Sequence, residues 1–259
     1  MVPKAFTRFF ACLLLLWAAS PLAANTIEPD ITSVNQPDAI LFIGNSFTFY
    51  NGGIDYHLSE LARADAQYSN PVTHRQAFGG ETLQGHVQRR QSGEVIAQFP
   101  WDIVVIQGYS NEPLTHNERF ERYAKELASA SKAHGATPVF FMTWAYPGQP
   151  SMTQPLHDAY TAIANKTGAM VVPVGLAFAA AQKAFPDTSF FSDNKHSNAL
   201  GTYLAACTFY AALYNKTVIE NRYTMGLPED MALALQRIAT DTVDAFYQRG
   251  IRASTSVAN

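Results

Sequence analysis

Five strand-like runs alternate with stretches of helical periodicity, and this alternation constrains the fold more than any other feature of the chain. The runs are "AILFIG" (39–44), "VTHRQAF" (72–78), "DIVVIQ" (102–107), "PVFFMTW" (138–144) and "AMVVPVG" (169–175). Four are almost continuously apolar, as parallel strands covered on both faces are, whereas 72–78 is more polar and fits an edge strand. Strand alternating with helix predicts an α/β fold with a mostly parallel sheet.

Helical periodicity marks the segments between and after these runs. Apolar residues share one face at Ile54, Leu58 and Leu61, and similar stripes run through 120–130 and 231–246. Another helix is expected from about 153 to 167. Asn117 and Gly135 are placed to begin and to end the helix between the third and fourth runs.

The amino-terminal segment has the composition of an export signal. Lys4 and Arg8 precede the apolar stretch "FFACLLLLWAA", and "SPLAA" offers small residues for cleavage near Ala24. We therefore expect a cleaved signal peptide (1–24), a lead-in (25–38), a single domain (39–250) and a disordered tail (251–259). The mature protein is expected in the periplasm or outside the cell, with no integral membrane segment, because no other stretch is long enough to span a bilayer.

Charge and cysteine content narrow the classes of partner. Loss of Lys4 and Arg8 takes the formal charge of −3 to −5, and no basic stripe is present, so nucleic acid is not an expected partner. Cys207 is the one cysteine left after cleavage, so no internal disulfide is expected; it lies in an apolar stretch and is predicted to be a buried, inert thiol. The sequence leaves the oligomeric state open.

Residues that carry chemistry follow the predicted strands. Ser46 follows the first run, the Gly79–Gly80 pair the second, and Asn111 the third, while Asp193 and His196 come later, in "SDNKHSNALG". In open α/β sheets, sites lie outside the carboxyl ends of the strands, so these residues are predicted to meet at one edge.

These residue types suit acyl transfer. A serine hydroxyl needs a base to take its proton, and His196 is the proposed base for Ser46. Asp193, three residues before the histidine, is placed to orient the imidazole and to stabilise its charged form. The backbone N–H groups of Ser46 and Gly80 and the side-chain amide of Asn111 are candidate donors to the oxyanion.

Together these blocks resemble the SGNH (GDSL-like) hydrolases over roughly residues 39 to 214. The matching blocks are "GNS" after the first strand, "GGET" after the second and "DNKH" near the carboxyl terminus. The resemblance implies a flavodoxin-like three-layer α/β/α sandwich with a mostly parallel five-stranded sheet, and a serine esterase or related acyl hydrolase. Asn45 stands where the family usually has Asp. The family's third block, a Gly-x-Asn after the third strand, is irregular in this chain: Asn111 stands at the Asn position, but Tyr109 occupies the Gly position. Gln107 is therefore kept beside Asn111 as a substitute donor.

The substrate and the exact activity stay open. Tyr109 and Trp144 are predicted to line a substrate cleft, which would suit a glycan O-acetyl ester or another small ester. An acyltransferase on the same triad and a glycan-binding module without catalysis are the alternatives. No histidine pair has the spacing of a metal site, so we predict no metal, and the expected ester chemistry needs no cofactor. His57 lies in a helical pattern and is predicted at the surface.

Overall fold

A sheet of five parallel strands forms the centre of the protein. The computed structural model describes residues 37–65 and 71–248. The strands are ordered β2-β1-β3-β4-β5, and every neighbouring pair is parallel. Their bounds are β1 Ala39–Gly44, β2 Val72–Ala77, β3 Ile103–Ile106, β4 Thr137–Phe141 and β5 Met170–Val172. The predicted sheet is confirmed, including the edge position of the second strand.

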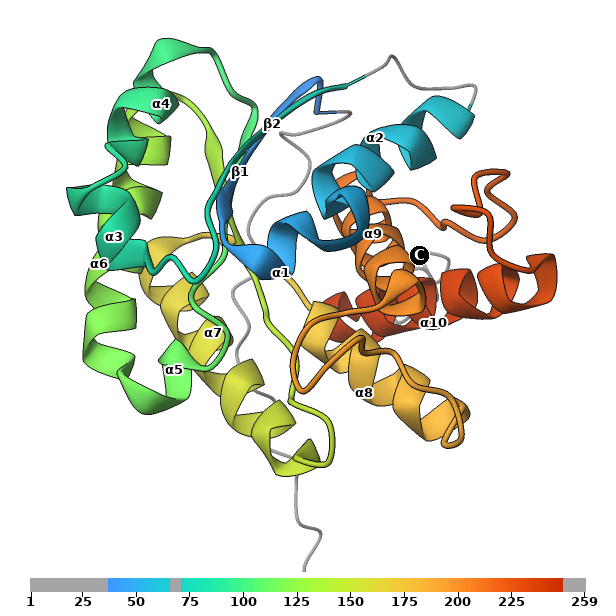
Figure 1. The fold of residues 1–259 in the computed structure, drawn as a ribbon. Coiled ribbons are helices and arrows are strands. Elements are labelled where there is room, and N and C mark those ends of the chain that lie inside the picture. Colours follow the sequence, from blue (N-terminus) through green and yellow to red (C-terminus); the bar gives the residue numbers. More distant parts are fainter. Residues whose placement is uncertain (1–36, 66–70, 249–259) are drawn as a thin grey trace, which may run out of the picture.

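Helices cover both faces of this sheet (Figure 1). The side chains of β1 alternate between the two layers: Ile40 and Phe42 pack into one apolar cluster, while Leu41 and Ile43 pack into the other. The cluster of Ile40 includes residues of α2 (Ile54–Ala64), α8 (Val174–Ala184), α9 (Ala199–Leu213) and α10 (Glu229–Tyr247). The opposite cluster includes residues of α3 (Leu83–Gln88), α4 (Ser92–Gln98), α6 (Asn117–Ala133) and α7 (Thr153–Thr167). The three-layer α/β/α sandwich is therefore confirmed.

The predicted helices and strands differ from the observed ones mainly at their ends. The helix expected at 153–167 is α7, and the one expected after Asn117 is α6. The fourth run leaves the strand after Phe141, and the fifth ends at Val172 because Pro173 follows and α8 begins at Val174.

The short connecting helices lie near the ends of the strands. Their bounds are α1 Ser46–Phe49, η2 Tyr50–Gly52, α5 Glu112–Thr115 and η3 Pro150–Met152. Among them, α1 directly follows the carboxyl end of β1 (Figure 1). This edge is where the sequence predicts the chemistry.

Several predictions concern parts of the chain beyond these elements. The signal peptide (1–24), the lead-in as far as residue 36 and the tail (251–259) lie outside the described residues. Within the described part of the chain, no helix combines the length and apolar character needed to cross a membrane.

Cys207 lies in α9 and is fully buried, as predicted, and this burial raises the pKa of its thiol.

Candidate active site

The turn after β1 places Ser46 at the start of α1. Asn45 caps this helix, its Oδ1 accepting a hydrogen bond from the backbone N–H of Phe47 at 3.2 Å. Gly44 is needed for space: a Cβ there would lie 2.5 Å from Thr48 Oγ1 and 2.7 Å from Gln107 Oε1. Its φ is not positive, so close packing, and not backbone freedom, explains the glycine.

Ser46, His196 and Asp193 form a continuous hydrogen-bonded line. His196 Nε2 lies 2.9 Å from Ser46 Oγ, and His196 Nδ1 lies 2.7 Å from Asp193 Oδ2. The two residues of the later block come from the loop between α8 and α9, so the contact joins positions 150 residues apart. The structure thus brings together the three residues that the sequence predicts as nucleophile, base and orienting acid.

Hydrogen bonds to Asp193 fix the roles of the two imidazole nitrogens. Asp193 Oδ1 accepts from the backbone N–H groups of His196 at 2.7 Å and Lys195 at 2.8 Å. The bond from the His196 N–H, followed by that from the His196 ring, lowers the pKa of Asp193 to about 2. The carboxylate is then ionised and accepts a hydrogen bond from Nδ1–H, which leaves the lone pair of Nε2 facing the Ser46 hydroxyl.

Aromatic rings hold the imidazole of His196 in place. The ring of Tyr50 stacks on it with a centroid distance of 4.0 Å and an interplanar angle of 4°. Phe47 meets it edge-on, with a centroid distance of 5.8 Å. A stacked phenol ring also favours the imidazolium that forms when the base takes up a proton.

The turn that carries Tyr50 is anchored by His57, which the sequence places at the surface. His57 is 5% exposed, so this prediction is wrong. Its Nε2 donates to the carbonyl of Asn51 at 2.7 Å, and its Nδ1 lies 2.6 Å from the hydroxyl of Tyr223. Asn51, at φ +50°, also donates through Nδ2 to the carbonyl of Ser197, next to His196. His57 therefore supports the residue that stacks on the imidazole.

Asn45 is the centre of a buried polar network beneath the site. Its backbone N–H donates to Gln107 Oε1 at 3.0 Å, and its Oδ1 accepts from Gln107 Nε2 at 3.1 Å. Its Nδ2 donates to the carbonyls of Glu81 at 3.0 Å and Gly108 at 3.4 Å. One side chain thus ties the loops after the first three strands together.

The three predicted oxyanion donors differ in how far their hydrogen bonds are already used. Ser46 is the first residue of α1, so its N–H has no acceptor within the helix. Gly80 is exposed, at φ +68°, and its N–H donates to no backbone carbonyl of the described residues. Asn111 is half-buried and its side chain does not cap α5.

Gln107, the predicted substitute donor, is excluded by its contacts. It is fully buried, and its amide nitrogen donates to Asn45 Oδ1 and to the carbonyl of Gly108. Both N–H groups are therefore engaged, and none faces a substrate. The prediction of Gln107 as a substitute is wrong because the residue completes the network around Asn45.

The two predicted cleft aromatics have different environments. Tyr109 is half-buried and lines an open pocket. Trp144 is fully buried, so its assignment to the cleft is wrong. Its indole stacks between Phe47 and Phe178, both at 4.3 Å, and its Nε1–H donates to the carbonyl of Lys195 at 2.8 Å. Trp144 therefore supports, through a hydrogen bond to Lys195, the loop that carries His196.

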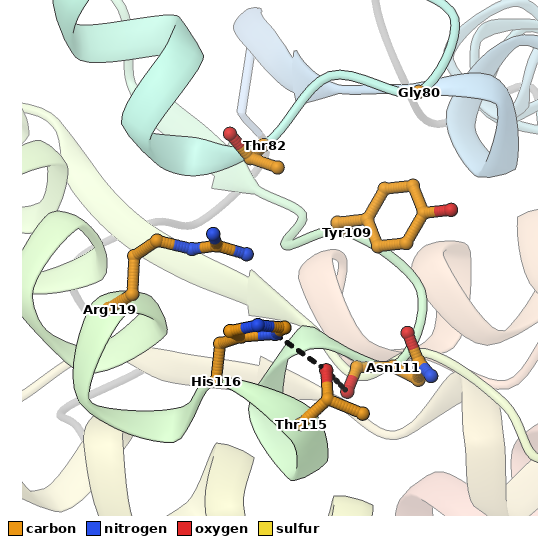
Figure 2. Close-up of a pocket in the computed structure, with 7 residues that line it drawn as sticks. All are labelled: Gly80, Thr82, Tyr109, Asn111, Thr115, His116 and Arg119. Carbon is orange, nitrogen blue, oxygen red and sulfur yellow. Dashed lines mark hydrogen bonds between the residues drawn. The ribbon is translucent and has the colours of Figure 1, made fainter.

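The pocket that Tyr109 lines has a volume of about 480 Å³, and two of the candidate oxyanion donors, Gly80 and Asn111, are among its lining residues (Figure 2). It is lined by Gly80, Thr82, Tyr109, Asn111, Thr115, His116 and Arg119. The residues come from the loops after β2 and β3 and from the helices that follow β3. Within residues 37–65 and 71–248, no three His, Cys, Asp or Glu side chains are grouped as metal ligands would be.

Solved structures of other proteins share the fold of this chain. No family model matches the chain, and no curated protein matches it. A DUF4886 family protein from Bacteroides uniformis aligns with a TM-score of 0.70 and 23% identity, over 79% of this chain and 94% of that one. A candidate SGNH hydrolase from Slackia heliotrinireducens aligns with a TM-score of 0.55 and 26% identity, over 66% and 96%.

An acetylxylan esterase from Geobacillus stearothermophilus also aligns, with a TM-score of 0.57 and 18% identity, over 73% of this chain and 99% of that one. The chain therefore has the SGNH hydrolase fold, which confirms the fold implied by the sequence resemblance. The match to the Slackia protein supports the resemblance of this chain to the SGNH hydrolases.

Proposed function

We propose that this protein is a serine ester hydrolase. The observation that carries the proposal is the line from Ser46 Oγ through the imidazole of His196 to the Asp193 carboxylate, with contacts of 2.9 and 2.7 Å. A hydroxyl, a base and a buttressing acid in this order form the arrangement that activates serine for acyl transfer. The likeness in fold to esterases supports the same class of reaction.

In the first half of the reaction, His196 Nε2 takes the proton of the Ser46 hydroxyl while Oγ bonds to the ester carbonyl carbon. The carbonyl oxygen becomes an oxyanion, which accepts hydrogen bonds from the N–H groups of Ser46 and Gly80 and from the Asn111 amide. His196 then gives its proton to the departing alcohol oxygen as the C–O bond breaks, and the acyl group stays on Ser46.

In the second half, water takes the place of the alcohol. His196 accepts a proton from the water while its oxygen attacks the acyl carbon, and the proton then passes to Ser46 Oγ as the carboxylic acid leaves. The Asp193 carboxylate stays ionised throughout and stabilises each imidazolium. No step of this cycle requires a cofactor.

For the substrate, we propose a short acyl ester, with an O-acetyl group on a glycan favoured. The fold likeness to an acetylxylan esterase supports this choice, and an open pocket next to the oxyanion donors leaves room for more than an acyl group. We further propose that the amino-terminal segment exports the protein to the periplasm or beyond. Amino-terminal sequencing of the protein secreted by its host is expected to start at residue 25.

The test is hydrolysis of p-nitrophenyl acetate and butyrate by the mature protein, beside Ser46→Ala and His196→Ala. Each variant is expected to lose on the order of 10⁴-fold or more in kcat, with little additional loss in the double variant. Wild-type rates in both variants would place the activity elsewhere. A protein that turns over neither ester would favour the glycan-binding alternative, and acyl transfer to an added sugar in preference to water would favour the transferase.

A further inference from the structure

The pocket beside the oxyanion donors presents a cation whose hydrogen-bonding capacity is mostly unused. Arg119 Nε bonds to Glu112 Oε1 at 2.6 Å. Its two terminal nitrogens make no hydrogen bond with another described residue, and Figure 2 shows the guanidinium reaching into the pocket toward Tyr109. Four N–H groups on the terminal nitrogens thus remain available in the fork geometry that matches a carboxylate.

A second side chain of the pocket has a nitrogen left for a ligand. The Thr115 hydroxyl donates to the Asn111 carbonyl at 3.2 Å, so its oxygen accepts from His116 Nδ1–H at 3.0 Å. Nε2 of the exposed His116 has no partner among the described residues. It accepts from a sugar hydroxyl when the ring is neutral and donates to an anion when the ring is charged.

Charge around the pocket favours an anion. Among the described residues, no carboxylate lines the pocket. The acid that pairs with Arg119 is buried, since the Glu112 side chain is 1% exposed and that of Arg119 is 37% exposed. Arg89 and Arg90 pair in the same way with the buried Glu81, next to Gly80. These ion pairs hide the negative partner and leave the positive one at the surface.

One further cation lies on the side of the catalytic loop. Lys195 Nζ is 5.7 Å from the ring centroid of Tyr109, and Lys195 directly precedes His196. Gly80 and Asn111 line the pocket and are also the proposed oxyanion donors, so a group bound in the pocket belongs to the ester whose carbonyl they hold.

We propose that this pocket binds a carboxylate carried by the substrate, so that the enzyme prefers esters with an acidic group. Arg119 pairs with the carboxylate through its terminal nitrogens, and His116 and Thr82 bond to neighbouring hydroxyls. The proposal rests on the proposed hydrolase function. The carboxylate belongs either to the alcohol part, as in an acetylated uronic acid, or to the acyl part, as in a dicarboxylic half-ester.

The test measures kcat/KM in two pairs of esters. An acetylated methyl glucuronide is compared with the matching acetylated methyl glucoside, and p-nitrophenyl hemisuccinate is compared with p-nitrophenyl butyrate. We expect the acidic member of one pair to be preferred by about tenfold or more, as for a charge-assisted bidentate contact. The pair that shows the preference identifies the part of the ester that carries the carboxylate.

The variant Arg119→Gln/Glu112→Gln removes the guanidinium without leaving a buried carboxylate unpaired. We expect it to lower the preference for the acidic ester at least about fivefold, and Arg119→Lys to give an intermediate value. Arg122→Gln is the matched control, because Arg122 is exposed on the same helix and stacks on Tyr123; its preference is expected to equal that of wild type. Thermal unfolding confirms that each variant is folded.

Two results would overturn the proposal. One is a wild-type enzyme that hydrolyses p-nitrophenyl acetate but prefers neither acidic ester. The other is a preference that survives in both Arg119 variants. Absence of any activity on p-nitrophenyl acetate would instead contradict the hydrolase function itself, so failure of the pocket and failure of the function are distinguishable.

Discussion

Asn45 and Ser46 are adjacent in the chain, yet the structure uses their polar groups in opposite ways. Asn45 is 2% exposed, and every hydrogen-bonding atom of its side-chain amide faces a partner from the segments that follow β1, β2 or β3. Ser46 is half-buried, and its hydroxyl meets a single partner in the described part of the chain, the imidazole of His196. The first residue holds the loops together, while the hydroxyl of the second keeps hydrogen-bonding capacity unused.

This contrast separates two kinds of polar residue at one sheet edge. A saturated buried network resists change, because loss of one partner leaves another group desolvated without a hydrogen bond. A reactive group must keep unused capacity for the substrate. Substitutions in the network around Asn45 are therefore expected to lower stability. Substitutions of Ser46, His196 or Asp193 are expected to lower activity with little effect on folding.

The largest effect is expected from Asp193→Asn. Because Oδ1 of Asp193 accepts from two backbone N–H groups, the amide oxygen of Asn would take that place and its NH₂ would face His196 Nδ1. The ring would then carry its proton on Nε2 and could not accept that of Ser46. We expect kcat to fall on the order of 10⁴-fold. A pH–rate profile with wild-type kcat would contradict this role of Asp193.

Asn45→Asp is expected to have the next largest effect, on stability. The new carboxylate would be buried and would face the carbonyl oxygens of Glu81 and Gly108, to which Nδ2 now donates. We expect a loss of about 2–4 kcal/mol in the free energy of unfolding, measured by urea denaturation. Ser46→Ala is the control and is expected to change stability by about 1 kcal/mol or less. Equal stability of Asn45→Asp and wild type would show that the network is not essential.

His57→Phe tests whether the buried His57, which anchors the turn of Tyr50, also affects the position of His196. The change leaves the Asn51 carbonyl and the Tyr223 hydroxyl without their partner, and we expect a loss of about 1–3 kcal/mol in unfolding free energy. If Tyr50 orients His196, kcat should also fall several-fold at unchanged KM. A loss of stability with unchanged kcat would confine His57 to a structural role.

The smallest effect is expected in the pH dependence of stability and comes from His86. This residue is fully buried, with Nε2 donating to the Gly44 carbonyl at 2.7 Å. Burial is the main cause that lowers the pKa of His86 below its ordinary value of 6.5, against the opposing influence of the Gly44 carbonyl and Glu81.

Below pH 6.5 the unfolded chain therefore binds a proton that the folded protein does not, so stability falls as the pH drops. We expect His86→Gln to reduce this slope by at most about 1.4 kcal/mol per pH unit, as measured by urea denaturation between pH 5 and 8. An unchanged slope in the variant would show that His86 is not the group responsible.

The sequence predicts the sheet well because its signal is local. A strand buried on both faces reads as a continuous apolar run, and β1 occupies the predicted residues 39–44. The meeting of Ser46 with Asp193 and His196 was also predictable, because parallel strands bring their carboxyl ends to one edge. The catalytic role of these three residues remains a prediction.

The errors concern residues whose environment depends on distant partners. Trp144 follows a strand end, as a cleft residue would. Its indole N–H, however, donates to the Lys195 carbonyl, and both faces of its ring stack on aromatic rings. Gln107 and His57 are polar, and the sequence predicts an accessible position for each. Each is buried because partners 62 and 166 residues away, Asn45 and Tyr223, satisfy its hydrogen bonds, and no local pattern reveals them.

The measurement that tests the central claim most directly is covalent labelling of the mature protein with a fluorophosphonate, followed by peptide mapping. If Ser46 is the activated nucleophile, the label replaces the hydroxyl proton of Ser46 as fluoride leaves, and His196→Ala is labelled far more slowly. Labelling of another residue, or none in a folded protein under conditions that label a known serine esterase, would contradict the claim.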